Sequence, residues 1–465
     1  MITIDIGTIN DFPKEEAARF AKLVNTFNLH QTNNNLKNRY YEGKVSLGEV
    51  NLGIALPEGM RQLEIGCAWG AKTVDVLAGR SMFDGFVGAN GEDVVLLDEI
   101  TVNNNLIAEY IKAARDELKY GCTFATLSAD DKGRAKVCFH SPLTAAAEWN
   151  GEKRRVDYGF AIIDSAPDNY DQTWTPSLIN YYTDTDIWVL SKNNSIWNAE
   201  RHPHIMGRPM MEALIWNATS NKPFGRSRIK EPIRRLIEGY VRTIANATIG
   251  LEFSTAPQKY MLGITDEQYD KLINQKFKQY VGSIIAATTN PETGEKPQFG
   301  QLMQGSITPH VEMIRILATQ FSAASGLTVT DTGVVNDANP TSSDAILAQS
   351  QTLVSMAEQL NIGNGNALRN IALMAIAIEN KTSIDNLTDD QKAIIAHFKN
   401  PAMPSVAVTA DAAIKIASAR QGFASTDTFL EMIGFDKAEI RRIKNQESRQ
   451  RGMQLVEEVN NELNA

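Results

Sequence analysis

The chain has 465 residues, which is more than one hydrophobic core usually holds, so we expect two to four domains or one long modular subunit. Apolar residues make up 43% and charged residues 22%, a balance that excludes disordered and collagen-like chains. The 46 Lys and Arg residues against 55 Asp and Glu residues leave a net charge of −9, which disfavours a protein that coats nucleic acid through bulk positive charge.

The cysteines and the N-terminal residues limit the cellular compartments in which we expect this protein. Cys67, Cys122 and Cys138 are odd in number and lack metal-ligand spacing, which disfavours a disulfide framework and fits a reducing compartment. The start MITIDIGTINDFPKEE lacks the basic and apolar regions of a signal peptide, and no run of about 18 apolar residues occurs. We therefore expect a protein that is neither secreted by that route nor membrane-spanning.

The first quarter of the chain has the periodicity of helices. Apolar residues recur at helical spacing after Pro13, and a second helical pattern follows Pro57 as far as Leu77. A third pattern covers residues 104–120, and Gly121 is placed to end that helix. These apolar faces predict core packing rather than a cofactor site.

From Cys122 the hydrophobic period changes to two. Residues 122–129 and 134–141 predict a hairpin around the turn Asp130–Gly133, and VDYGFAII, SLINYYT, TDIWVLS and NSIWNAE predict further strands. The stretch GRPMMEALIWNATSNKPFG predicts a loop. An antiparallel sheet inserted among helices places the chain in the α+β class.

Two long helices and a small insertion are predicted next. Apolar residues from Ile229 to Ile244 form a stripe over roughly four helical turns. A compact α/β insertion follows, with a helix that starts at Thr265 and a short strand SIIAA. A second long helix starts at Thr308, with Pro309 suited to its first turn, and stops near Gly326.

The last part of the chain predicts a loop and then further helices. Residues 327–340 are small and polar, which favours a loop. A helix restarts at Thr341, and Gly363 and Gly365 predict that it is kinked or broken. Pro401 and Pro404 mark a boundary, after which short helices rich in Ala, Arg and Glu are expected.

No complete catalytic or metal-binding pattern is visible. The segment GCAWGAKT (residues 66–73) has its glycines too close for a phosphate loop, has Ala71 before Lys72, and has a helical context, which predicts close helix packing. His202 and His204 lack a third ligand at metal spacing. We expect no catalytic residue, no cofactor and no metal site.

One basic stretch stands out in this acidic chain. Seven cationic residues against Glu231 and Glu238 give residues 222–242 a local charge of +5. Such a run is either a solvated face or, at helical spacing, a surface that contacts phosphates without reading bases. The cationic residues are Lys222, Arg226, Arg228, Lys230, Arg234, Arg235 and Arg242.

Several segments, in order, resemble portal proteins of long-tailed bacteriophages. The segment FGRSRIKEPIRRLIEGYVRTIANATIGLEFSTAPQKYMLG has that family's Gly-Arg-Ser run, long amphipathic helix and aromatic-Pro-Gln-aromatic element. The segments YYEGKVSLGEV, GRSMFDGF, GQLMQGSITPHVEMIRILATQFSAASGL and NPTSSDAILAQSQTLVSMAEQ match further family elements, and DTFLEMIGFDKAEIRRIKNQESRQ agrees loosely. Together the closer matches cover most of residues 38–360.

The resemblance implies a multidomain α+β subunit. Its expected parts are a wing of helices and antiparallel sheet (1–220), a first stem helix (221–253), a small α/β clip (254–305), a second stem helix (306–326), a tunnel loop (327–340), a long broken wing helix (341–400) and a helical C-terminal crown (401–465).

The resemblance also implies a function and partners. Such subunits form a homo-oligomeric ring, usually of twelve, at one capsid vertex of the virion, and double-stranded DNA passes through it during packaging and ejection without sequence reading. Implied protein partners are the terminase large subunit, the major capsid protein and a head–tail adaptor, with assembly in the host cytoplasm. A separate terminase motor drives the DNA, so we expect no enzyme.

Two alternatives stay open at this stage. One is an enzyme of the packaging apparatus, a nuclease or an ATPase, and the other is a capsid structural protein that forms no ring. The candidate channel-loop residues are Thr330, Asp331, Thr332, Val334, Asn336, Asp337 and Asn339. The candidate contacts to DNA or a neighbouring subunit are Arg226, Arg228, Lys230, Arg234 and Arg235.

Overall fold

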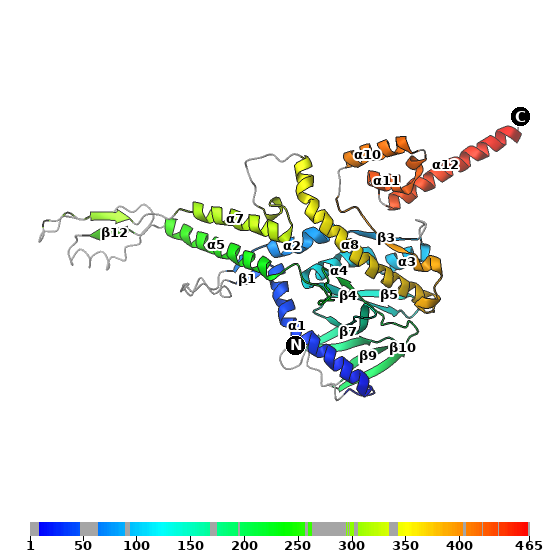
Figure 1. The fold of residues 1–465 in the computed structure, drawn as a ribbon, viewed down its shortest axis with the longest axis horizontal. Coiled ribbons are helices and arrows are strands. Elements are labelled where there is room, and N and C mark those ends of the chain that lie inside the picture. The colour runs from blue at the N-terminus through cyan, green and yellow to red at the C-terminus, as the bar shows by residue number, and fades with distance from the viewer. Residues whose placement is uncertain are drawn as a thin grey trace. The chain divides into compact units, whose positions relative to one another are not determined.

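The computed structural model divides the chain into two compact units, Met1–Pro401 and Ala402–Ala465 (Figure 1). The division falls at Pro401, where the sequence predicts a boundary. The described residues are 9–46, 64–88, 94–167, 174–193, 196–255, 259–262, 294, 296, 298–301, 306–333, 343–402, 406–420, 422–435 and 437–463.

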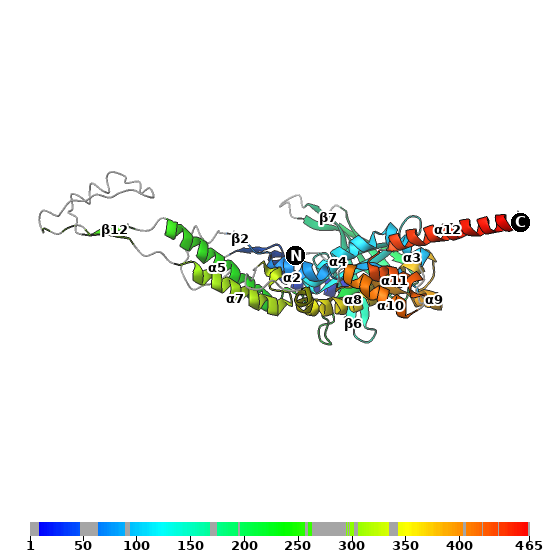
Figure 2. The same cartoon turned by 90° about the horizontal axis from the view of Figure 1, so that it is seen from above.

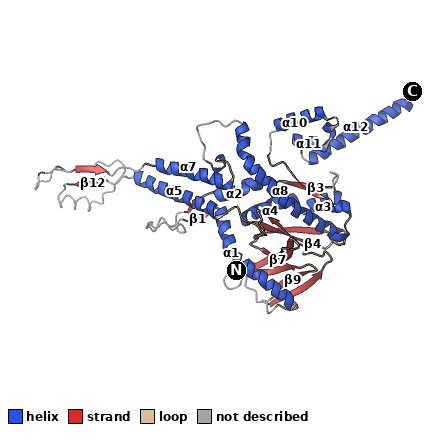
Figure 3. Ribbon diagram, viewed as in Figure 1, coloured by secondary structure: helices blue, strands red, loops and turns tan. Residues whose placement is uncertain are grey.

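Among the described residues, two antiparallel sheets of more than two strands lie in the first unit, as the change of period predicts, which confirms a mixture of helices and antiparallel strands (Figure 3). The larger sheet has the order β10-β9-β8-β7-β6. Its strands are β6 (Ala145–Asn150), β7 (Arg155–Pro167), β8 (Trp174–Tyr182), β9 (Asp186–Asn193) and β10 (Ile196–Pro203). The smaller sheet has the order β11-β4-β5, with β4 (Cys122–Ala129), β5 (Ala135–His140) and β11 (Met211–Ile215).

Strand β11 corrects the prediction of a loop over residues 207–225. Met211 pairs with Thr126 and Ile215 with Cys122, so β11 adds an edge to the smaller sheet. The four residues from Met211 to Leu214 are all buried. A short run that is buried on both faces shows no alternation, and periodicity alone does not distinguish it from a loop flanked by glycine and proline.

The first hydrophobic core lies between helix α1 (Lys14–Tyr41) and the larger sheet. As predicted, α1 begins directly after Pro13, which suits the residue before a first turn because it needs no helical partner for an N–H. Phe20 is fully buried and packs its ring 5.5 Å from the rings of Phe160 and Tyr181. The side chains on the inner face of α1 thus hold it against β7 and β8.

A second core surrounds the smaller sheet. Helix α4 (Leu106–Tyr120) ends as predicted at Gly121, whose φ of 115° suits glycine, and packs on β4 and β5. Around it lie α3 (Val95–Asn103), the strand pair β3 (Phe83–Val87) and β14 (Ile395–Phe398), the short helix α9 (Asp389–Lys392) and the 3₁₀ turn η5 (Ile384–Asn386).

A third core joins α2 (Trp69–Ala78) to two long helices, α5 (Glu231–Thr255) and α7 (Thr308–Ser325). The helices α5 and α7 lie side by side in both views (Figures 1 and 2). Helix α7 has the predicted bounds and ends at Gly326, which has a φ of 71°. A small strand pair, β1 (Lys44–Ser46) and β2 (Glu64–Gly66), lies near the start of α2.

Helix α5 begins ten residues later than the predicted start at residue 221. Gly225 makes the chain turn tightly before it, because its φ is +70° and an added Cβ would lie 2.1 Å from the carbonyl oxygen of Trp216. Pro232 then sits in the first turn of the helix, where proline is tolerated. Arg226, Arg228 and Lys230 therefore precede the helix and do not follow helical spacing.

Helix α8 (Ser343–Glu379) corrects the prediction of a broken helix. It is continuous over 37 residues, and Gly363 and Gly365 lie inside it. A Cβ on Gly365 would meet the ring of Phe398 at 3.5 Å, an ordinary van der Waals distance, so β14 packs beside this part of the helix. The N-terminal half of α8 contributes Leu353 and Leu360 to the third core, and its C-terminal half belongs to the second core.

The predicted insertion at residues 254–305 is described only in part. The strands β12 (Lys259–Leu262) and β13 (Gln298–Gln301) pair antiparallel, while the predicted helix at Thr265 and the strand SIIAA lie outside the described residues. The second unit holds α10 (Val406–Ala419), the 3₁₀ turn η6 (Phe423–Ser425), α11 (Asp427–Ile433) and α12 (Lys437–Leu463). Helix α12 has 27 residues, so the prediction of only short helices in this region is wrong.

Candidate functional site

The structure separates the five predicted basic contacts. Arg226 and Lys230 are exposed on the irregular segment before α5. Arg234 is half-buried on α5, with its guanidinium 5.9 Å from the centre of the Tyr40 ring. Arg235 is exposed and forms ion pairs with Glu231 and Glu238 at 3.4 and 3.0 Å.

Arg228 is a correction, because the prediction places it on an exposed surface. Arg228 is only 7% exposed. Its Nε donates to the carbonyl oxygen of Thr73 on α2 at 2.6 Å, and one terminal nitrogen donates to the carbonyl oxygen of Ser325 at 2.6 Å. Ser325 is the last residue of α7, where the helix dipole attracts a cation. Arg228 therefore connects α2 to the end of α7.

Arg228 stays charged in this environment. Burial lowers the pKa of its guanidinium to about 10, which still leaves it protonated at neutral pH. The guanidinium also lies 5.9 Å from the centre of the Trp216 ring and borders a cavity of about 340 Å³. Backbone carbonyls and an aromatic face thus stabilise the charge.

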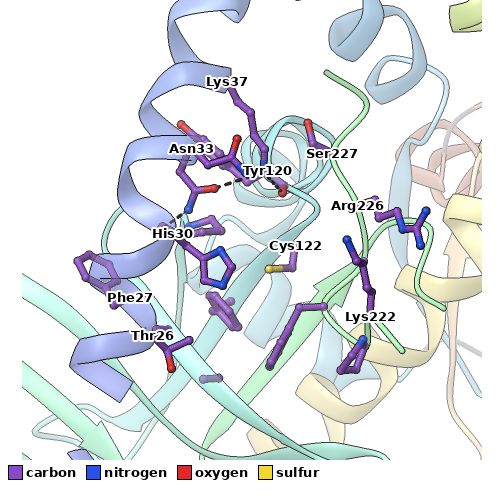
Figure 4. A pocket seen from close by; sticks show the side chains of 18 of the residues that line it. Thr26, Phe27, His30, Asn33, Lys37, Tyr120, Cys122, Lys222, Arg226 and Ser227 are labelled. Carbon is purple, nitrogen blue, oxygen red and sulfur yellow. Dashed lines mark hydrogen bonds between the residues drawn. The ribbon is translucent and has the colours of Figure 1, made fainter. Parts of the chain in front are cut away.

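Three of the five predicted basic contacts, Arg226, Lys230 and Arg234, border a larger cavity of about 690 Å³ (Figure 4). Figure 4 shows Phe27, His30 and Lys37 of α1 on one side and the segment with Lys222 and Arg226 on the other. Lys230 and Arg234 also line the cavity. The irregular segment and α5 therefore bring most of the predicted basic residues to one hollow, together with a lysine of α1.

Lys37 was not predicted as a site residue. Its ammonium donates to the carbonyl oxygen of Tyr120 at 3.1 Å and to Oδ1 of Asn34 at 3.4 Å. Burial lowers its pKa, and the charges of Arg234 and Lys222 lower the pKa further. Its position in the sequence could have indicated that Lys37 faces inward. The buried residues Phe20, Phe27 and Asn34 on α1 define a helical face that Lys37 continues.

The predicted channel loop is only partly described. Thr330–Thr332 form the 3₁₀ turn η4, so the start of the loop has secondary structure that the sequence did not predict. The side chain of Asp331 accepts hydrogen bonds from the backbone and hydroxyl of Thr328, and Trp69 Nε1 donates to the carbonyl oxygen of Thr332 at 3.2 Å. Val334, Asn336, Asp337 and Asn339 lie outside the described residues.

The GCAWGAKT segment follows a strand and opens a helix, so the predicted helical context is wrong. Strand β2 ends at Gly66 and α2 begins at Trp69. The predicted close packing is present, because a Cβ on Gly70 would lie 2.1 Å from the carbonyl oxygen of Tyr40 at the end of α1. The spacing of the glycines and lysine still differs from that of a phosphate loop.

A buried polar cluster between α4 and α8 was also missed. Asn364 Nδ2 donates to Oε2 of Glu117 at 2.7 Å and to the Tyr110 hydroxyl at 3.0 Å. All three residues are fully buried, and burial raises the pKa of Glu117 to about 8. The spacing of Glu117 from Tyr110 on α4 indicates an inward position, whereas no local pattern predicts a partner 247 residues away.

The histidine pair and the thiols offer no site within the described part of the chain. His204 contacts the carbonyl oxygen of Thr183 at 3.2 Å, and no group of three His, Cys, Asp or Glu residues is placed to hold a metal there. All three cysteines are free, and burial raises the pKa of Cys122 to about 12. No helix in the described ranges has the length and apolar character to cross a bilayer.

Several known proteins are similar to this chain. The portal protein of Mycobacterium phage D29 is 22% identical over 447 residues, covering 93% of this chain and 89% of that protein. Among solved structures, a chain in the virion of a native gene transfer agent is 12% identical with a TM-score of 0.44, covering 79% of this chain and 89% of that chain. A chain in the neck of an empty gene transfer agent particle is 12% identical with a TM-score of 0.46, covering 79% and 90%.

The comparison with protein families identifies the class of this α+β subunit. The family described as phage portal protein, SPP1 Gp6-like, matches residues 22–453. The chain therefore belongs to this family of bacteriophage portal proteins, as its sequence resemblance implies. Portal proteins are structural components of the virion.

Proposed function

We propose that this portal subunit assembles into a ring of twelve at one capsid vertex, with a central channel for DNA packaging and ejection. The observation that carries the proposal is the family match over residues 22–453, nearly the whole chain. The paired helices α5 and α7 support it, since they have the form expected of a portal stem on either side of a clip at residues 254–305. The ring also serves as a platform for the terminase large subunit, the capsid protein and a head–tail adaptor.

The domain map of the proposal follows the elements. The wing comprises residues 1–220 and α8, the stem comprises α5 and α7, and the crown comprises residues 401–465. Electron microscopy of negatively stained purified protein, with light scattering for mass, tests the assembly. Rings with a central hole are expected, whereas a uniform population of monomers would contradict the proposal.

We further propose that residues 327–340 reach into the channel and contact DNA. This stretch contains no Lys or Arg, which suits weak contact with passing phosphates. Its start is fixed by the contacts of η4 with α2. Bulky thiol reagents on Val334→Cys and Asn336→Cys, in a background without native cysteines, should impair packaging and ejection. Unchanged packaging and ejection after labelling would show that the loop lies elsewhere.

We propose that the subunit has no catalytic activity of its own and that a separate terminase motor moves the DNA. The departure of GCAWGAKT from a phosphate loop supports this, because Gly70 is explained by packing against Tyr40. ATP hydrolysis by purified protein that disappears in Lys72→Ala would favour the enzymatic alternative instead.

A further inference from the structure

The 690 Å³ cavity combines a cationic rim with an apolar floor. Five cationic side chains line it and have no carboxylate partner among the residues that the structure describes: Lys37, Lys222, Arg226, Lys230 and Arg234. The two carboxylates in its wall are engaged elsewhere, Glu148 with Lys22 at 2.8 Å and Glu231 with Arg235 at 3.4 Å. The cavity therefore carries an excess of positive charge that its own walls do not neutralise.

The floor of the cavity is aromatic. Phe224 lies with its ring centre 5.8 Å from those of both Phe124 and Trp149. Phe27, which is 4% exposed, completes this side from α1. An aromatic centre surrounded by polar and charged side chains is the arrangement found where one protein anchors a side chain of another.

Bringing cations together in a partly buried space is unfavourable unless an anion joins them. Lys37 shows the effect most clearly, because it is half-buried and its hydrogen-bond acceptors among the described residues are the neutral oxygens of Tyr120 and Asn34. A carboxylate placed among Lys37, Lys222 and Arg234 would relieve their repulsion and form charge-assisted hydrogen bonds. The cavity is thus complementary to a segment that carries acidic side chains and an apolar one.

We propose that this cavity is a docking site for an acidic segment of a second copy of the chain. A subunit with a net charge of −9 supplies the complementary charge. A duplex fits less well, because its phosphates lie on a convex outer surface and cannot reach an apolar floor. The proposal rests on the proposed ring and adds to it the residues that join neighbours.

Such a contact has a direction. The cationic cavity of one copy meets a different, acidic surface of the next copy, so in the proposed ring the contact is heterologous and repeats from subunit to subunit. Each copy then offers one cavity and fills one. Because exposed charges contribute to the contact, salt should weaken assembly.

Charge reversal at the rim tests the proposal in the full-length protein. The variant Lys222→Glu/Arg226→Glu/Lys230→Glu changes three exposed side chains, and circular dichroism should show an unchanged fold. The matched control is Lys132→Glu/Lys136→Glu/Lys381→Glu, which reverses three exposed charges elsewhere. By sedimentation velocity, the rim variant should need at least tenfold more protein than the control to assemble.

The outcomes separate the two proposals. Wild-type protein that never assembles would overturn the proposed ring itself. A wild type that assembles together with a rim variant that assembles equally well would overturn the docking site alone. If the rim variant assembles normally but loses affinity for a labelled 30-base-pair duplex, the cavity binds DNA and the docking proposal is wrong.

Discussion

Two regions of the first unit bury ionisable side chains, one basic and one acidic, by different means. At the junction of α2 and α7, the guanidinium of Arg228 remains charged because backbone carbonyls, including one at a helix C-terminus, accept its hydrogen bonds. At the contact of α4 and α8, burial raises the pKa of Glu117, so its carboxyl group holds a proton at neutral pH beside Asn364. The peptide backbone can solvate a buried cation, whereas the buried acid is accommodated by becoming neutral.

This difference predicts different responses to mutation and pH. The cation is present throughout the acidic and neutral range, so its loss should matter at every pH in that range. The acid is accommodated only in its protonated form, so its effect should depend on pH.

Arg228→Met should give the largest effect. It removes a charged donor from the carbonyl oxygens of Thr73 and Ser325 in a buried site, and we expect the free energy of unfolding to fall by about 3–5 kcal/mol. Urea denaturation followed by tryptophan fluorescence measures this change. The exposed neighbour variant Arg226→Met is the control and should stay within about 0.5 kcal/mol of wild type. Equal stabilities of the two variants would show that Arg228 does not connect α2 to α7.

Glu117→Gln should change how stability depends on pH. Folding raises the pKa of Glu117 from 4.5 to about 8, so the folded state binds more protons than the unfolded state between these values. Wild-type stability should therefore fall as pH rises from about 5 to 8, by about 3 kcal/mol relative to Glu117→Gln. Thermal melting at several pH values measures the difference.

The control for that experiment is Glu109→Gln on the same helix, where the carboxylate forms an ion pair with Lys112 near the surface. Its melting curve should track wild type across the whole pH range. Parallel pH profiles for wild type and Glu117→Gln would mean that Glu117 is not held protonated.

Gly70→Ala should lower the free energy of unfolding by less than Arg228→Met does. The added methyl group would meet the carbonyl oxygen of Tyr40 and push α2 from α1, and α2 carries the Thr73 carbonyl that Arg228 contacts. We expect a loss of about 1–3 kcal/mol of stability. Gly66→Ala, with no atom within 4 Å of its added Cβ, should leave stability nearly unchanged. Equal stabilities of the two variants in chemical denaturation would contradict the packing role of Gly70.

Arg235→Gln should produce the smallest change. Arg235 is exposed and its ion pair with Glu231 lies at the surface, where water and salt screen it, while the less exposed Glu238 keeps the hydrogen bond that the Tyr40 hydroxyl donates. We expect no measurable shift of the urea midpoint, in contrast to Arg228→Met only seven residues away. A clear loss of stability would show that exposed and buried arginines of this segment act alike.

The sequence predicts the elements whose signals are local. Helix α4 has an unbroken amphipathic pattern and a glycine at its end, and α7 has a proline at its start and a glycine at its end. These features act within a few residues, so they can be read without a structure. The turn Asp130–Gly133 is an equally local signal, and β4 and β5 pair around it as predicted.

The features that the sequence does not predict depend on distant partners. Gly363 and Gly365 weaken a helix locally, yet α8 continues through them because β11 and β14 pack against it. Arg228 looks like part of a solvated basic face, but its acceptors come from α2 and α7. The cavity likewise needs Lys37, which lies 185 positions before Lys222 in the sequence.

Helix α8 has a consequence for how the first unit unfolds. Its N-terminal half supplies Leu353 and Leu360 to one core, and its C-terminal half supplies Leu368 and Ile376 to another. Neither core can lose its half of the helix without exposing the end of the other, so the two should melt in one cooperative transition. Amide hydrogens on both sides of Asn364 should then exchange with solvent at a common rate, set by the opening of both cores together.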